Sequence, residues 1–97
     1  MITSKQRAAL RGLGTALEPT YQIGKGEILP VQIEALDAQI EKRELIKIGV
    51  LRASPINAKE AAEILAQKLK AEVVAVTGGK ILLYRRSKSD KVKRIEF

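Results

Sequence analysis

Residues 72–84 have the sequence EVVAVTGGKILLY, in which two short apolar segments flank the pair Gly78-Gly79. A Gly-Gly pair between apolar segments indicates a two-residue β-hairpin, because the turn needs backbone angles that glycine adopts readily. We therefore expect antiparallel strands at Glu72–Val76 and Ile81–Tyr84. The hairpin would supply the C-terminal half of a sheet.

The residues before the hairpin predict a helix preceded by a strand. Asn57, followed three residues later by Glu60, predicts the start of a helix that runs to about Lys70. Leu45–Leu51 alternates in the manner of a strand with two different faces. Its more apolar face contains Ile46, Ile48 and Val50, and its other face contains Leu45, Lys47, Gly49 and Leu51.

The N-terminal half predicts two further helices and one strand. A helix should begin between Glu27 and Val31 and end near Lys42, because apolar residues recur there at helical spacing. A short strand is expected at Thr20–Ile23, and a first helix at about Thr3–Leu17. In that first helix the leucines should face inward, with Arg7, Arg11 and Gly14 together on the outer face.

The predicted order of elements is α-β-α-β-α-β-β. This order favours an α/β fold, a two-layer sandwich with a mixed four-stranded sheet. At 97 residues the chain has the size of one domain. We expect the domain to cover residues 1–86, followed by a basic tail at 87–97.

Composition limits the possible functions. The chain has no cysteine and no histidine, which excludes thiol chemistry, zinc fingers and histidine acid/base catalysis. We expect no cofactor and no metal, and no enzymatic activity. Neither an apolar run long enough to span a membrane nor a signal peptide is evident, so a cytoplasmic protein is expected.

The net charge of +7 lies at the two ends of the chain. Residues 12–84 contain nine basic and nine acidic side chains, whereas residues 1–11 contribute +3 and residues 85–97 contribute +4. Basic charge confined to particular segments is typical of a nucleic-acid partner, because contacts to phosphates release condensed counterions. A merely solubilising surface is the alternative.

The loop Gly24-Lys25-Gly26 is the best candidate site, since it lies between a predicted strand and the start of a helix. Backbone N–H groups at such a position favour phosphate oxygens, and the absence of a Cβ allows close approach. A plain turn is the alternative. Together with the basic ends and Lys47, the loop would form one RNA-binding surface. The predicted RNA-binding residues are Lys5, Arg7, Arg11, Gly24, Lys25, Gly26, Lys47, Arg85, Arg86 and Lys88.

The three aromatic residues are too few for a stacking platform that holds several bases. For Tyr21 we favour packing over contact with a base. Tyr84 is expected to close the edge of the sheet, while its neighbours Arg85 and Arg86 contact phosphate.

Several segments resemble the CRM domain in its single-domain bacterial form, the YhbY-like proteins. The resemblance covers nearly the whole chain and rests on these segments: Ser4-Lys5-Gln6-Arg7, Leu17-Glu18-Pro19, Gln22-Ile23-Gly24-Lys25-Gly26, Glu44-Leu45-Ile46-Lys47-Ile48 and Val76 to Arg85. It implies a fold similar to the C-terminal domain of translation initiation factor three. It also implies RNA binding, with precursor large-subunit ribosomal RNA as the partner. The sequence leaves the oligomeric state open, and we expect a monomer.

In that family the loop after the first strand follows a Gly-x-x-Gly pattern. Gly24, Lys25 and Gly26 match its first three positions, but Glu27 occupies the fourth. A carboxylate at that position would repel phosphate and shift RNA toward Lys25 and the arginines of the first helix.

Two other functional classes remain open at this point. The chain could be a protein-interaction module that docks on a ribosomal protein or an assembly GTPase through the helix ending near Lys42. An enzyme acting on RNA is the other class, but the residues that such catalysis commonly uses are missing.

Overall fold

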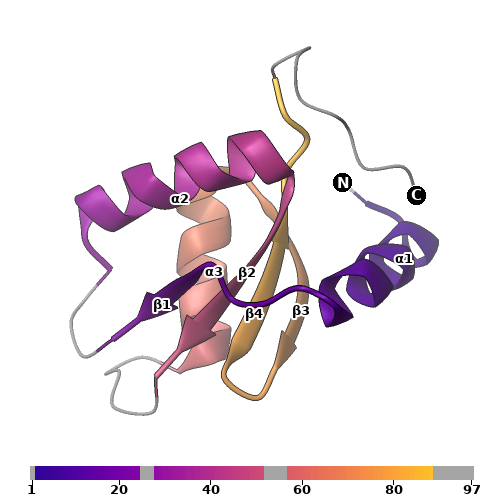
Figure 1. Cartoon of the computed structure of the whole chain (residues 1–97), viewed down its shortest axis with the longest axis horizontal. Helices are drawn as coiled ribbons and strands as arrows, with labels where there is room; N and C mark the ends of the chain where they lie inside the picture. The colour runs from indigo at the N-terminus through magenta and orange to yellow at the C-terminus, as the bar shows by residue number, and fades with distance from the viewer. Residues whose placement is uncertain (1, 25–27, 52–56, 89–97) are drawn as a thin grey trace.

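The computed structural model describes residues 2–24, 28–51 and 57–88, and it has the predicted order of elements (Figure 1). The elements are α1 (Ser4–Thr15), β1 (Tyr21–Ile23), α2 (Pro30–Arg43), β2 (Leu45–Val50), α3 (Ala58–Leu69), β3 (Glu72–Thr77) and β4 (Lys80–Tyr84). The α/β class is therefore confirmed.

The four strands form one mixed sheet in the order β1-β2-β4-β3. β1 runs parallel to β2, whereas β4 pairs antiparallel with both β2 and β3. The expectation that Tyr84 closes a sheet edge is wrong, because β4 lies between two other strands. Tyr84 is buried, and in the strand register it lies opposite Leu45 of β2 and Glu72 of β3.

The main core lies between one face of the sheet and the pair of helices α2 and α3. Alternation along β2 directs Ile46 and Ile48 toward this core, as expected for a strand whose faces differ. Tyr21 packs against the same core, which confirms that its ring has a packing role. The buried members are Ile23, Leu36, Ile40, Ile46, Ile48, Ala61, Ala62, Leu65, Leu69, Ile81 and Leu83.

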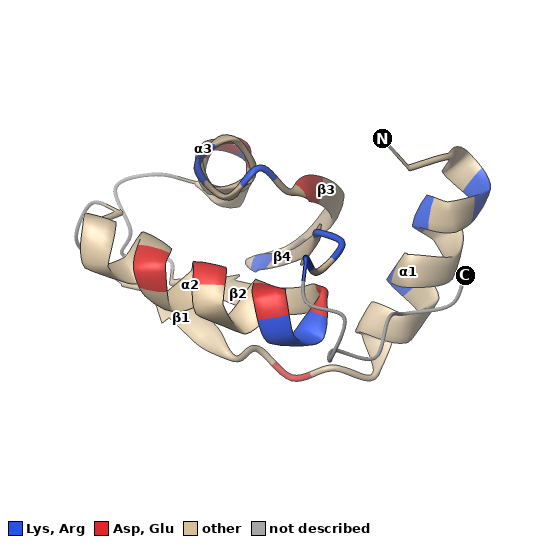
Figure 2. Ribbon diagram, turned by 90° about the horizontal axis from the view of Figure 1, so that it is seen from above, with Lys and Arg blue, Asp and Glu red and all other residues tan. Residues whose placement is uncertain are grey.

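Helix α1 packs on the opposite face of the sheet, apart from α2 and α3 (Figures 1 and 2). A second, smaller core forms there, in which Leu10 of α1 contacts residues from three strands. Its buried members are Leu10, Leu45, Val74, Leu82 and Tyr84. The sheet thus has α2 and α3 on one face and α1 over part of the other face.

The predicted faces of α1 are wrong in part. Arg7 and Gly14 face the sheet together with Leu10, whereas Leu13 is 48% exposed. These three inward positions share one side of a helix, since they are separated by three and four residues. The apolar pattern placed Leu13 inward, but contact with the sheet is made at Gly14 because the absence of a side chain lets the helix approach closely.

Local signals set the ends of the helices and the hairpin as predicted. Thr3 and Gln6 form a reciprocal capping box at the start of α1, and Asn57 accepts a hydrogen bond from the Glu60 amide at the start of α3. In the hairpin, Gly78 has a φ of 58°. A Cβ on Gly79 would lie 2.8 Å from the Val50 carbonyl oxygen, so this turn needs both glycines.

Candidate nucleic-acid interface

A cleft of about 300 Å³ lies between the C-terminal half of α1 and the face of the sheet that α1 partly covers. Its lining comes from α1, β2, β3 and β4. The lining residues are Arg11, Gly14, Thr15, Lys47, Ala75, Thr77, Lys80 and Leu82. Three of them are basic and none is acidic, so the cleft offers a positive site to a ligand.

The strand register places two lysines at this cleft. Lys47 is opposite Leu82, and Gly49 is opposite Lys80, so all four residues share one face of the sheet. The Lys80 side chain extends over Gly49, where a Cβ would lie 3.4 Å from the Lys80 Nζ. Glycine at position 49 therefore leaves the space that the Lys80 ammonium group occupies.

Lys47 joins the sheet to the end of α1. Its Nζ donates hydrogen bonds to the carbonyl oxygens of Leu17, at 3.2 Å, and Gly14, at 3.4 Å. A cation is favourable at this end of a helix, because unpaired carbonyls give it partial negative charge. An ammonium group has three N–H donors, so one of them remains for solvent or a ligand.

The predicted basic residues of α1 separate into different environments. Arg11 is exposed at the cleft, and Lys5 is exposed near the start of the helix. Arg7 instead points toward the sheet, where its guanidinium donates a hydrogen bond to the Val73 carbonyl. The structure thus brings Arg11 and Lys47 together and gives Arg7 an internal partner.

Lys80 is the basic residue at the cleft that the sequence analysis missed. Its position directly after Gly79 made it look like part of a turn. The signal that identifies it is the pairing of β2 with β4, which places Lys80 opposite Gly49 on the same face as Lys47.

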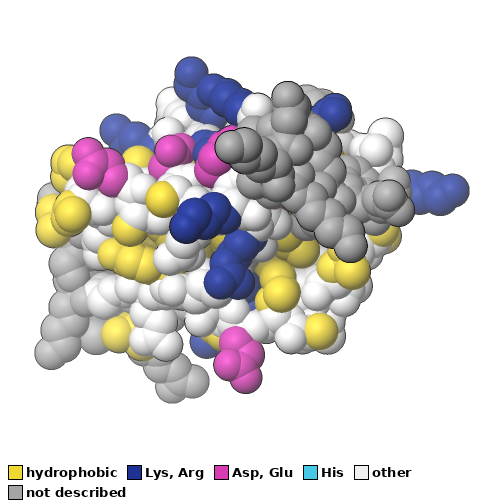
Figure 3. Space-filling view, turned by 45° about the horizontal axis from the view of Figure 1, so that its top comes forward, with side chains coloured by type: hydrophobic (Ala, Val, Ile, Leu, Met, Phe, Trp, Pro, Cys, Tyr) yellow, Lys and Arg dark blue, Asp and Glu magenta, His cyan; other side chains and the backbone are white. Residues whose placement is uncertain are grey.

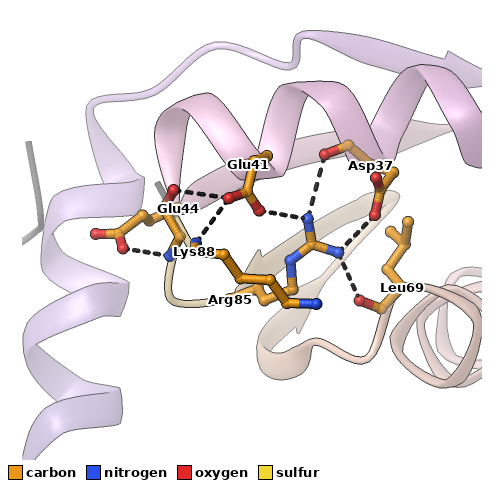
Figure 4. Close-up of polar contacts among 7 residues, drawn as sticks. Asp37, Glu41, Glu44, Leu69, Arg85 and Lys88 are labelled. Carbon is orange, nitrogen blue, oxygen red and sulfur yellow. Dashed lines mark hydrogen bonds and ion pairs between the residues drawn. The ribbon is translucent and has the colours of Figure 1, made fainter. Parts of the chain in front are cut away.

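Arg85 is held by internal contacts from α2 and α3 (Figure 4). Its guanidinium donates to the Asp37 carboxylate at 2.6 Å, to Glu41 at 3.0 Å and to the Leu69 carbonyl at 2.9 Å. The Arg85 side chain is only 15% exposed. This geometry favours a structural role, in which Arg85 ties the end of β4 to both helices.

The two residues that begin the predicted basic tail also contact the end of α2. The Ser87 hydroxyl and the Lys88 amide both donate to Glu41, and the Ser87 amide donates to the buried Glu44. The hydrogen bonds from the Lys88 amide and the Ser87 hydroxyl, together with Arg85, lower the pKa of Glu41. The side chains of Arg86 and Lys88 lie at the exposed surface.

The predicted Gly24-Lys25-Gly26 loop is described only at its first residue. Lys25, Gly26 and the neighbouring Glu27 lie outside the described residues. Gly24 is half-buried, and a Cβ there would make an ordinary contact with Leu51. Gln22, two residues earlier, is opposite Gly49, so the Gln22 side chain is on the face of the sheet that holds the cleft.

The charge on α2 differs from that on α1. Among charged residues α1 contains only Lys5, Arg7 and Arg11, whereas α2 carries both signs (Figure 2). A space-filling view shows acidic side chains over the top of the molecule, where α2 lies, with basic ones nearby (Figure 3). The basic cleft and the mixed surface of α2 thus belong to opposite faces of the sheet.

Within residues 2–24, 28–51 and 57–88, no group of three or more acidic, histidine or cysteine side chains could hold a metal ion. In this part of the chain no helix has the length and apolar character needed to cross a membrane.

The chain belongs to the CRS1/YhbY (CRM) domain family, whose model matches residues 2–85. This match confirms the resemblance found in the sequence. It spans α1 through the first residue after β4, so every element that lines the cleft lies within the family domain.

Similar proteins come from several organisms. Probable RNA-binding protein YqeI of Bacillus subtilis is 35% identical over 91 residues, which cover 94% of this chain and 95% of that protein. Probable RNA-binding protein MJ0652 of Methanocaldococcus jannaschii is 38% identical over 86 residues, 87% of this chain but 63% of that protein. The solution structure of the hypothetical protein SAV1595 from Staphylococcus aureus, a candidate RNA-binding protein, superimposes with a TM-score of 0.79. The two chains are 43% identical, and the match covers 94% of this chain and 95% of that one.

Proposed function

We propose that this protein binds structured RNA through the cleft between α1 and the sheet. The observation that carries the proposal is the convergence of Arg11, Lys47 and Lys80, from three different elements, on a cleft whose lining contains no carboxylate. The names of the relatives YqeI and MJ0652 support RNA as the polyanion.

Exposed basic residues at both ends of the chain would extend this surface. Lys5 lies on the same helix as Arg11, while Arg86 and Lys88 follow β4. The Gly24-Lys25-Gly26 loop would add backbone contacts to phosphate, since it follows β1, the strand next to β2, and precedes helix α2. Arg7 and Arg85 would act indirectly, by holding α1 and the end of β4 in place.

The proposed partner is precursor RNA of the large ribosomal subunit, bound by a monomer in the cytoplasm during subunit assembly. This finer proposal rests on the resemblance to YhbY-like proteins. The alternative of docking on a protein through acidic α2 is less favoured, because Asp37 and Glu41 are already bonded to Arg85. Their charge is partly neutralised by Arg85, although the Asp37 side chain is 57% exposed.

Charge reversal tests the cleft directly. The double variant Arg11→Glu, Lys80→Glu should bind a bulged RNA duplex at least tenfold more weakly than the wild type in fluorescence anisotropy. The double variant should also lower the slope of log affinity against log salt, by about 1 for each phosphate contact that is lost.

The matched control is Lys59→Glu combined with Lys68→Glu, two exposed lysines of α3 on the other side of the sheet. This control changes the net charge by the same amount. If both double variants lose affinity equally, binding depends on net charge alone and the cleft is not the site.

The ribosomal part of the proposal needs a separate experiment in cells. RNA crosslinked to the protein should be concentrated on large-subunit RNA in fractions that contain assembly intermediates, and the cleft variant should lose these crosslinks. Cosedimentation of the cleft variant with those particles at the wild-type level would instead favour docking on a protein.

A further inference from the structure

We infer that the cleft holds one unpaired nucleotide of the RNA, with the base in the cleft and the flanking phosphates at its rim. This inference rests on the proposed function and specifies the RNA feature that is recognised. It follows from three properties of the cleft: an apolar floor, a cationic rim and a small size.

The floor of the cleft is apolar. Leu82 and Ala75 come from the sheet, and Gly14 brings the backbone of α1 close to Leu82. A phosphate placed on such a floor would lose hydration without gaining hydrogen bonds there, which is unfavourable for an anion. The face of a nucleobase suits the floor, because it is flat and gains from apolar contact.

The rim supplies groups that a nucleotide needs. The guanidinium of Arg11 is exposed beside the floor, and a guanidinium plane can stack on a base. Lys47 and Lys80 provide ammonium donors for the phosphates on either side. The hydroxyl of Thr77 is a further group that could pair with a base edge.

Size limits the occupant to about one nucleotide. The volume of about 300 Å³ lies at the lower end of the range for small-ligand sites, which is roughly 300–1,000 Å³. A paired base cannot enter, because a duplex keeps its bases stacked inside, whereas a bulged base is free to turn outward. The geometry therefore selects an unpaired position over a continuous duplex.

Three RNAs separate this inference from simple phosphate binding. They are a fully paired duplex, the same duplex with one bulged nucleotide, and that bulge with its base removed. The wild-type protein should bind the bulged duplex about tenfold more tightly than the other two, since a change of this size lies within the range that stacking of one base commonly contributes.

A variant that fills the cleft without changing charge supplies the second measurement. Ala75→Leu should abolish the preference for the bulge while leaving affinity for the paired duplex unchanged. The same change at Ala38, an exposed position of α2, should keep the preference. Thermal melting would verify that both variants fold.

A photocrosslink from 4-thiouridine at the bulge provides a readout that needs no variant. Crosslinks should map to α1, β2, β3 or β4 in the wild-type protein, since these elements line the cleft. Equal, salt-dependent binding of all three RNAs, or crosslinks confined to other segments, would overturn the nucleotide inference and leave the proposed function standing. Failure to bind any of the three RNAs would overturn both.

Discussion

Gly14 of α1 lies directly against Leu82 of β4, and a Cβ on residue 14 would overlap both methyl groups of that leucine. Leu82 is also part of the cleft floor and of the smaller core. One close contact between a helix backbone and a strand side chain therefore sets how near α1 lies to the sheet, and with it the width of the cleft.

Replacement by alanine should change the free energy of unfolding in opposite directions at the two glycines of α1. Gly14→Ala should lower the free energy of unfolding by about 1–2 kcal/mol, because the new methyl group must displace Leu82 or the helix. Gly12 has nothing within 4 Å of a Cβ, so Gly12→Ala should raise it by about 0.5–1 kcal/mol through helix propensity. Urea unfolding measures both, and equal stability of the two variants would contradict the packing described.

Arg85→Lys should destabilise the fold by about 1–2 kcal/mol. A lysine cannot reproduce the planar set of donors that reaches Asp37, Glu41 and the Leu69 carbonyl together. Arg86→Lys is the matched control at an exposed site and should lie within about 0.5 kcal/mol of the wild type. At temperatures where Arg85→Lys remains folded, its RNA affinity should match the wild type, and a large loss would give Arg85 a direct contact with RNA.

Replacement of the two lysines of the cleft should affect stability and RNA binding differently. Lys47→Met removes the hydrogen bonds to the Gly14 and Leu17 carbonyls, so it should cost about 1 kcal/mol of stability and also weaken RNA binding. Lys80→Met should weaken binding with little change in the free energy of unfolding. Chemical unfolding combined with anisotropy tests this prediction. If Lys80→Met destabilised the fold and Lys47→Met did not, Lys80 would have the structural role instead.

Acid should loosen the contact between the end of α2 and the segment that follows β4. The pKa of Glu41 is lowered from its ordinary value of 4.5, chiefly by hydrogen bonds from the Lys88 amide and the Ser87 hydroxyl. A carboxyl group whose pKa is lower in the folded state stabilises the fold fully above its unfolded pKa. That contribution is lost as the pH falls from about 4.5 through the folded pKa.

Replacement of Glu41 by glutamine should therefore reduce the dependence of unfolding free energy on pH below about 4.5. Ser87→Ala removes one of the donors to Glu41 and should give an intermediate dependence. Unfolding measured at a series of acidic pH values checks both variants. A Glu41→Gln protein with the wild-type dependence would show that the contact contributes nothing.

Local patterns were sufficient to predict every helix and strand in order. Gly78-Gly79 and the Asn57 cap act within a few residues, so their effects can be recognised without knowing the rest of the fold. The position of β4 between β2 and β3 depends instead on pairing between distant segments. This pairing explains why Tyr84 was wrongly placed at an edge.

The candidate site was predicted less completely, because a basic side chain can serve an internal or an external partner. Arg7 and Arg85 have internal partners that lie far away in sequence, and no local pattern distinguishes them from Arg11. Lys80 was missed because its place at the cleft depends on its pairing with Gly49. Contact of the predicted residues with RNA stays a prediction.

The place of β4 in the sheet also affects when the protein can act during its own synthesis. Among the described strands β4 is synthesised last, yet it separates β2 from β3 and contributes Leu82 and Lys80 to the cleft. A nascent chain that lacks β4 can pair β1 with β2, but it cannot join β3 to them. The proposed recognition of RNA through the cleft therefore requires β4, so we expect an unfinished chain that lacks this strand not to compete for the same RNA.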